Sequence, residues 1–435
     1  MFLKMNYFKR FFLVFFGFVL FPLVGINAQG LKNLTLKQAI NISLSSNPEI
    51  VAARALVEEK QGEEMEAKSA VYPSILAKGT LTLLNPTLSA SFGLFAFPID
   101  TSPNFNTSLQ FQYLIYNGGI RENTIKKARL SVSSQKYFSD SVKLQKVLAV
   151  KEAFLLVLFN KFKVLAARWF LNSAEANEST AEQLYKTGVQ PRLIFLNAKI
   201  RVREAKEKLS NAEADYKKSL DNLAISMGLK PGEVESIHGN FIEDPIQPLN
   251  RLLQEAYQNR PEIKQDDAEI QKARLQIKIA NAAQAPSLFL FAGGSYFTRP
   301  FIPFFPVFQE EAGLEANWSF EFGKKNGRLK QAKSALAQVE AKLKLDKESI
   351  ALQLSTAYID ALEAHKEVLS YAQNLRESRE SFEDAMAAFA NNLISSSQLD
   401  ETLDLANQTQ IDYLQALYRY NEALARISSY VRGKP

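Results

Sequence analysis

The chain has 435 residues, enough for two ordinary domains or one large repeated unit, and its 46% hydrophobic and 23% charged residues exclude a disordered or collagen-like protein. It has no cysteine, which excludes disulfides, thiolate metal sites, a cysteine nucleophile and a lipid-modified N-terminal cysteine. The net charge is only +6, and basic residues alternate with acidic ones along helical segments such as 201–208, so we expect no nucleic-acid partner.

Residues 1–28 have the organisation of a secretory signal peptide. Three basic residues precede an apolar run over 11–24, and cleavage is expected after Ala28. The alternative is a retained membrane anchor, but a run of roughly 14 residues is shorter than the roughly 18 that a spanning helix needs. No later stretch is long enough to span as a helix, so a membrane-spanning part would have to consist of β-strands.

The two halves of the chain follow one plan. Four motifs occur once in each half and in the same order: NPEI (47–50) and RPEI (260–263), YPS (72–74) and APS (285–287), YLIYNGG (113–119) and WSFEFG (318–323), YKTGV (185–189) and FANNL (389–393). We therefore expect a first repeat over residues 29–228, a linker rich in proline and glycine over 229–248, and a second repeat over 249–435.

Each repeat is expected to begin with a helix. Thr35 followed by Gln38 has the pattern of a capping box, and Asn47 before Pro48 is typical of an N-cap with proline in the first turn. The helix should end near Ala70, and the second repeat has the same arrangement over 249–285.

Two strands per repeat are then predicted from the alternation of apolar and polar residues, over 75–83, 108–115, 288–297 and 314–322. Lengths of about 9–11 residues fit tilted membrane strands, but a half-buried sheet in a soluble sandwich has the same pattern. The connections between the strands, 85–106 and Thr298 to Gln309, contain several prolines. The clustered phenylalanines of the second connection could form an interface girdle, fold inward over a pore or pack the loop itself.

Long helices follow the strands. Segments 121–187 and 328–392 contain neither glycine nor proline, and shorter segments return over 192–227 and 393–432. They are rich in strong helix formers. Apolar residues recur with heptad-like spacing, which predicts antiparallel coiled-coil pairs. Examples are Leu336, Val339, Leu343, Ile350 and Leu354. Each long helix would extend on the order of 100 Å.

Turn residues mark the points where the chain changes direction. Proline precedes the first strand of each repeat, and glycine supplies the positive φ between strand and helix; the residues are Pro73, Gly118, Gly119, Pro286 and Gly323. Gly188 is expected to reverse the first long helix, and Asn392, with the next-best residue type for a left-handed turn, takes its place in the second repeat.

This ordered duplication resembles the TolC-like outer-membrane factor family over nearly the whole mature chain. The resemblance implies a mainly α subunit with a β membrane portion. It implies a homotrimer whose twelve strands close one β-barrel in the lipid of the outer membrane, continued by an α-helical coiled-coil tunnel in the periplasm. It also implies a passive exit duct, supplied by an inner-membrane pump of the RND or ABC type through a periplasmic adaptor protein.

The resemblance also points to two sets of functional residues. In the family, acidic side chains at the start of the last helix narrow the periplasmic mouth; here the candidates are Asp400, Glu401 and Asp404, with Gln398 near one usual acidic position. The same carboxylates could simply complement the helix dipole. The helix tips meet the adaptor in the family, and the corresponding residues are Thr187, Gly188, Val189, Asn391, Asn392 and Leu393.

Nothing in the sequence predicts catalysis. The two histidines are isolated, and motifs for phosphate, dinucleotide or metalloprotease sites are missing, so we expect no enzyme, no cofactor and no metal site. Two other classes compete with the duct: a soluble periplasmic coiled-coil scaffold or adaptor, and a secreted enzyme on a helical frame. The amphipathic strands, and the absence of a lipoyl or barrel domain of the adaptor kind, argue against the scaffold.

Overall fold

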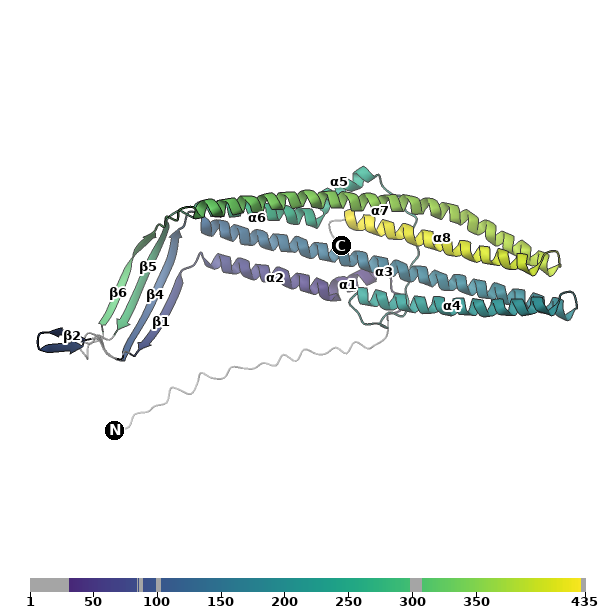
Figure 1. Ribbon diagram of the computed structural model, residues 1–435, viewed down its shortest axis with the longest axis horizontal. Helices are drawn as coiled ribbons and strands as arrows, with labels where there is room; N and C mark the ends of the chain where they lie inside the picture. Colours follow the sequence, from purple (N-terminus) through teal and green to yellow (C-terminus); the bar gives the residue numbers. More distant parts are fainter. Residues whose placement is uncertain (1–30, 84, 86–88, 99–102, 298–306, 432–435) are drawn as a thin grey trace, which may run out of the picture.

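A computed structural model describes residues 31–431 apart from 84, 86–88, 99–102 and 298–306. The predicted signal peptide and most of the phenylalanine-rich connection lie outside the described residues. Figure 1 shows a sheet at one end of the molecule and long helices that run from it to the opposite end.

Each repeat opens with two helices, where the sequence predicted one. They are α1 (Leu36–Ser46), α2 (Pro48–Ser69), α5 (Leu249–Asn259) and α6 (Pro261–Ala282). The capping box of Thr35 and Gln38 is confirmed. Asn47 separates the first two helices because its backbone is extended, and its side-chain oxygen accepts a hydrogen bond from the Glu49 amide at 2.9 Å. An N-cap residue ends one helix and begins the next in this way.

Four antiparallel strands form the main sheet in the order β1-β4-β5-β6. They are β1 (Ser74–Thr82), β4 (Asn104–Tyr116), β5 (Ser287–Phe297) and β6 (Val307–Asn317). The register explains the alternation in the sequence. One row of facing residues is Ile75, Phe111, Ala292 and Ala312, and the next row, on the opposite face, is Leu76, Gln110, Gly293 and Glu311. One face of the sheet is therefore mainly apolar and the other mixed and more polar.

Two strand predictions are wrong in part. The strand expected over 314–322 begins earlier and ends at Asn317, because its partner β5 begins at Ser287 directly after a proline and offers no ladder beyond it. Trp318 instead donates its indole N–H to the Gln284 carbonyl at 3.0 Å and packs its ring against that of Phe320. The connection over 85–106 is not only a loop, since it contains the hairpin of β2 (Ser89–Phe92) and β3 (Phe95–Pro98).

The long helices confirm the coiled-coil prediction. α3 (Ile120–Lys186) and α7 (Lys324–Ala390) have 67 residues each, and α4 (Arg192–Ser226) and α8 (Ser396–Val431) return alongside them. Figure 1 shows α2 and α6 beside the sheet-proximal halves of α3 and α7, and α4 and α8 beside the distal halves. Among the described residues, no helix combines the length and apolar character needed to cross a bilayer.

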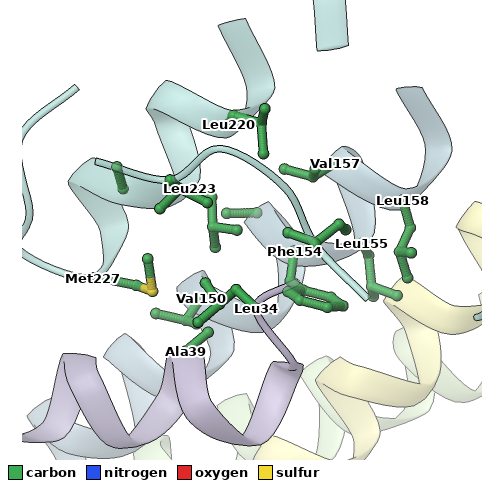
Figure 2. Close-up of a cluster of buried hydrophobic side chains, with 14 of the residues drawn as sticks. Leu34, Ala39, Val150, Phe154, Leu155, Val157, Leu158, Leu220, Leu223 and Met227 are labelled. Atoms are coloured by element: carbon green, nitrogen blue, oxygen red, sulfur yellow. The ribbon is translucent and has the colours of Figure 1, made fainter. Parts of the chain in front are cut away.

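The hydrophobic core lies near the middle of the molecule, where elements of both repeats and the linker meet. Figure 2 shows Phe154 and Val150 of α3 between Ala39 of α1 and Leu223 of α4. Met227, the C-cap residue of α4, lies in the same cluster, and all five residues are buried. The chain ahead of α1 pairs with the linker through two parallel bridges, which closes this core on one side. Two further large buried clusters lie outside this region. One joins α5, α7 and α8, and the other joins the distal halves of α3, α4, α7 and α8.

The predicted turn residues occupy the junctions between strands and helices. Pro73 and Pro286 directly precede β1 and β5, and Gly119 and Gly323 are the N-caps of α3 and α7, with φ of 81° and 82°. Gly118, with φ of 69°, has a second reason to be glycine. A Cβ atom there would lie 2.3 Å from the Cβ of Ala285, three residues beyond the end of α6.

We expect Gly118→Ala to destabilise the protein by about 2–5 kcal/mol, because left-handed backbone strain adds to an overlap with Ala285 that must be relieved. Gly62→Ala is the matched control. Gly62 lies inside α2 with no atom near its added methyl group, so alanine should stabilise that helix by about 0.5–1 kcal/mol. Denaturant midpoints of the two variants would check this, and equal midpoints would contradict the tight approach at Gly118.

Candidate functional site

The end of the molecule away from the sheet consists of two helix-reversing turns that lie side by side. At the end of α3 the amide of Val189 donates to the Leu184 carbonyl at 2.9 Å, and Gly188 has φ of 76°. At the end of α7 the amide of Leu393 donates to the Ala388 carbonyl, also at 2.9 Å, and Asn392 has φ of 58°. Both turns therefore close with the same αL geometry, as the sequence predicted.

The two turns contact each other through Gln190, whose side-chain amide donates to the side-chain oxygen of Asn392 at 2.5 Å. The predicted tip residues are thus brought together in one place: Thr187 and Asn391 are the C-caps of α3 and α7. Val189 is 49% exposed and Leu393 is 76% exposed. These two apolar side chains on neighbouring turns form a small exposed surface at the end of the molecule away from the sheet.

The three predicted acidic residues do not act as one group. Asp404 accepts a hydrogen bond from the guanidinium of Arg201 on α4 at 2.8 Å, and Asp400 lies 3.9 Å from the same guanidinium. Asp400 also accepts from the side-chain amide of Asn177 on α3 at 3.3 Å. Glu401 lies on the exposed side of α8. The structure therefore separates Asp400 and Asp404, which face Arg201, from Glu401, which faces solvent.

Arg201 and Asn177 are functional candidates that sequence reasoning missed. Arg201 belongs to a helix with mixed charges, which was interpreted as a solvated face, and its partners are about two hundred positions away in the chain. Glu204, one turn further along α4, lies 3.2 Å from the same guanidinium. The repeat offered one clue to Arg201. The equivalent position of the second repeat is Leu405, and a charged residue in one repeat where the other has an apolar residue indicates that the two positions have different surroundings.

Burial and neighbouring charges shift the pKa values of Asp400 and Arg201 in this cluster. Burial raises the pKa of the Asp400 carboxyl, the charge of Arg201 opposes this, and the charges of Asp404 and Glu204 add to it. For Arg201, burial acts to lower the pKa, but Asp404 and Asp400 outweigh it and raise the pKa of the guanidinium. Asn177 is 2% exposed, and among the described residues its side-chain oxygen has no hydrogen-bond partner. Ion pairs that are only partly buried in this way depend on both salt and geometry.

Comparisons with known proteins identify the family of the chain. The model of the family described as outer membrane efflux protein matches residues 39–229 and 252–431. The chain belongs to the outer membrane efflux protein family. It is therefore an outer-membrane efflux channel protein, and the resemblance drawn from the sequence motifs is confirmed. A search of curated protein sequences gives no match.

Solved structures share the fold over about nine tenths of the chain. The outer membrane protein VceC from Vibrio cholerae is 15% identical, with a TM-score of 0.76 over 92% of this chain and 96% of VceC. The CmeC outer membrane channel of Campylobacter jejuni is 12% identical, with a TM-score of 0.75 over 92% and 85%. The MtrE outer membrane channel of Neisseria gonorrhoeae, solved in an open state, is 17% identical, with a TM-score of 0.73 over 92% and 89%.

We expect the stability of this efflux protein to depend on pH through Asp400. Because the pKa of its carboxyl is raised in the folded state, the neutral form stabilises the fold; this contribution is complete below the ordinary value of 3.8 and is lost as the pH rises through the folded-state pKa. Asp400→Asn is neutral at every pH. Its melting temperature relative to the unmodified protein should therefore increase with pH, measured beside Glu401→Gln as a control for charge loss on α8. A difference that stays constant with pH would contradict the raised pKa.

Gly188→Val should strain the first tip turn by about 1–2 kcal/mol, because a β-branched residue disfavours the left-handed region. No atom lies near an added Cβ at this position, so the cost would come from the backbone alone. Gly188→Asn is the matched control, since the second repeat uses asparagine in the same turn. Hydrogen exchange at the amides of Val189 and Gln190 should accelerate in the valine variant and not in the asparagine variant; equal rates would show that the turn is unstrained.

Proposed function

We propose that three copies of this chain form the outer-membrane exit duct of an export system that also contains a periplasmic adaptor and an inner-membrane pump of the RND or ABC type. The observation that carries the proposal is that one copy is incomplete. In the sheet order β1-β4-β5-β6, the outer strands β1 and β6 each have only one partner strand among the described residues. Open sheet edges cannot face lipid, and closure into a barrel removes them.

The repeat indicates how the edges would be covered. Inside the chain, β4 of the first repeat pairs with β5 of the second. The same step from the second repeat back to the first would pair β6 with β1 of another copy. Three copies, the number that the family resemblance implies, would close twelve strands. The strands have 9–13 residues, close to the length of tilted membrane strands, and the apolar face of the sheet would contact lipid.

The helices support the same arrangement. α3 packs against α6 and α8 of the second repeat, so its flank is covered within the chain. At the positions of α7 that correspond to Leu148 and Leu155 of α3, Leu352 and Ile359 are 68% and 54% exposed. The step of seven residues between them is typical of a coiled-coil seam. In the proposed ring their partner is the first repeat of the next copy.

The direction of the duct follows from the signal peptide and the tips. Removal of residues 1–28 after export would release repeats over 29–228 and 249–435 on the far side of the inner membrane. The sheet would lie in the outer membrane, and the helices would extend into the periplasm. The exposed turns around Gly188 and Asn392 would then face the inner membrane and contact the adaptor. Transport through such a duct is passive, and we assign no catalytic residue and no cofactor to it.

The cluster around Arg201 gives the periplasmic mouth a means of closing. Arg201 holds α8 against α4, and Asn177 holds it against α3, so the two coiled-coil pairs of one copy stay together. Opening would slide the α7–α8 pair away from α3–α4, between two packings of the same helices. In this assignment Asp400 and Asp404 latch the mouth, and Glu401 is the carboxylate that lines it.

Two measurements on the same detergent extract test the proposal. Protein from the outer-membrane fraction should have the native mass of a trimer, and in planar bilayers Arg201→Gln should raise the resting conductance several-fold because the latch is lost. Arg203→Gln, at an exposed position two residues away, controls for charge and should leave the conductance unchanged. A monomer in the soluble periplasmic fraction would contradict the proposed duct. Equal conductance of the two variants would show that Arg201 does not keep the mouth closed.

A further inference from the structure

A pocket of about 550 Å³ lies where the two repeats and the linker meet, and the proposed duct gives it no role. Its walls come from α1, from the middle of α3, from the linker and from the C-terminal third of α8. The pocket forms within one chain, so it is complete without a second copy. Its volume falls in the range of about 300–1,000 Å³ that is usual for small-molecule sites in proteins.

The floor of the pocket is apolar. Phe154, Leu155 and Leu158 of α3 contribute to it, and all three belong to the buried cluster of Figure 2. Ile40 of α1 and Leu424 of α8 also line the pocket, and both are partly buried. Such a floor favours a ligand with an apolar body, because binding removes the apolar surface of both from water.

Hydrogen bonds hold the linker wall of the pocket in place. The side chain of Asn421 on α8 accepts from the Ile242 amide at 2.9 Å and donates to the Ile242 carbonyl at 3.0 Å. The amide of His238 donates to a carbonyl of the segment ahead of α1 at 2.9 Å. Between these anchors, a Cβ added to Gly239 would lie 3.3 Å from the Phe154 ring. The pocket is therefore a fixed feature of the fold.

The polar side chains around the pocket include two cations. Lys37 of α1 and Lys151 of α3 line it, together with His238 and Asn240 of the linker. Lys151 also donates to the hydroxyl of Ser428 on α8 at 3.4 Å. None of the described residues that line the pocket is acidic. The charge of the lining therefore complements an anionic group and repels a cationic one.

We propose that this pocket binds a small amphiphilic anion, with its aliphatic body on the apolar floor and an anionic head, such as a carboxylate, near Lys37 and Lys151. The occupant is a free solute and not a membrane lipid, because the 22 residues of α2 separate α1 from the sheet by about 33 Å. Once bound, it contacts the first repeat, the linker and the second repeat together. The proposal goes beyond the duct and does not depend on it.

Protection of a cysteine tests the site directly, because the chain has no cysteine of its own. In isolated outer-membrane fragments, millimolar octanoate should slow the reaction of Ser428→Cys with a maleimide several-fold. Octylamine, a cation at neutral pH, and uncharged octanol have the same tail and should protect much less. Ser210→Cys, at an exposed position of α4, is the control and should react equally fast with and without octanoate. Equal protection by all three compounds would overturn the preference for an anion, and no protection by any would overturn the site.

Variants of the lining give a second test in the same Ser428→Cys background. Lys37→Gln should raise the octanoate concentration needed for half-maximal protection several-fold, because one charge near the anionic head is lost. Lys32→Gln is the matched control, since Lys32 does not line the pocket and lies 3.2 Å from Glu235. Gly239→Leu should abolish protection by filling the space above Phe154. Equal octanoate concentrations for Lys37→Gln and Lys32→Gln would overturn the placement of the anionic head.

Discussion

The structure depends on one constraint. The strands and helices form a thin layer, and the elements at its two sides need a neighbour to cover them. Within the chain, the neighbour is the equivalent element of the other repeat. β4 pairs with β5, and α3 packs on α6 and α8, so the step from the first repeat to the second is satisfied within one chain. The step from the second repeat to the first is not. In the proposed trimer, a neighbouring copy would cover both the open edges of the outer strands and the exposed leucines of α7.

The long helices extend the molecule away from the sheet. They are joined to the sheet by left-handed glycines and reversed by left-handed turns, so each repeat folds back on itself with few residues in loops. Gly118 closely approaches Ala285 and Ala282, so the start of α3 lies against the end of α6. This elongated arrangement is consistent with membership of a family of outer-membrane efflux proteins.

The distal halves of the two repeats are joined by contacts of two kinds. A buried apolar cluster contains Phe170 of α3, Val202 of α4, Phe389 of α7 and Leu403 of α8. The ion pair of Arg201 with Asp404 lies beside this cluster. Partly exposed ion pairs stabilise a structure only weakly, so the apolar cluster adds cohesion that the ion pair alone would not supply.

The sequence by itself determined the two repeats, the long helices, the four strands and the left-handed turns, because these features follow from local periodicity and from the conformational freedom of single residues such as Gly188 and Asn392. It also carried the family resemblance. Tertiary structure alone decided where β6 ends, since Asn317 is the last residue with a partner on β5. It likewise decided that Asp400 and Asp404 face Arg201 while Glu401 does not. A strand end and an ion pair are properties of two segments far apart in the chain, and the pattern within one segment does not contain the position of the other.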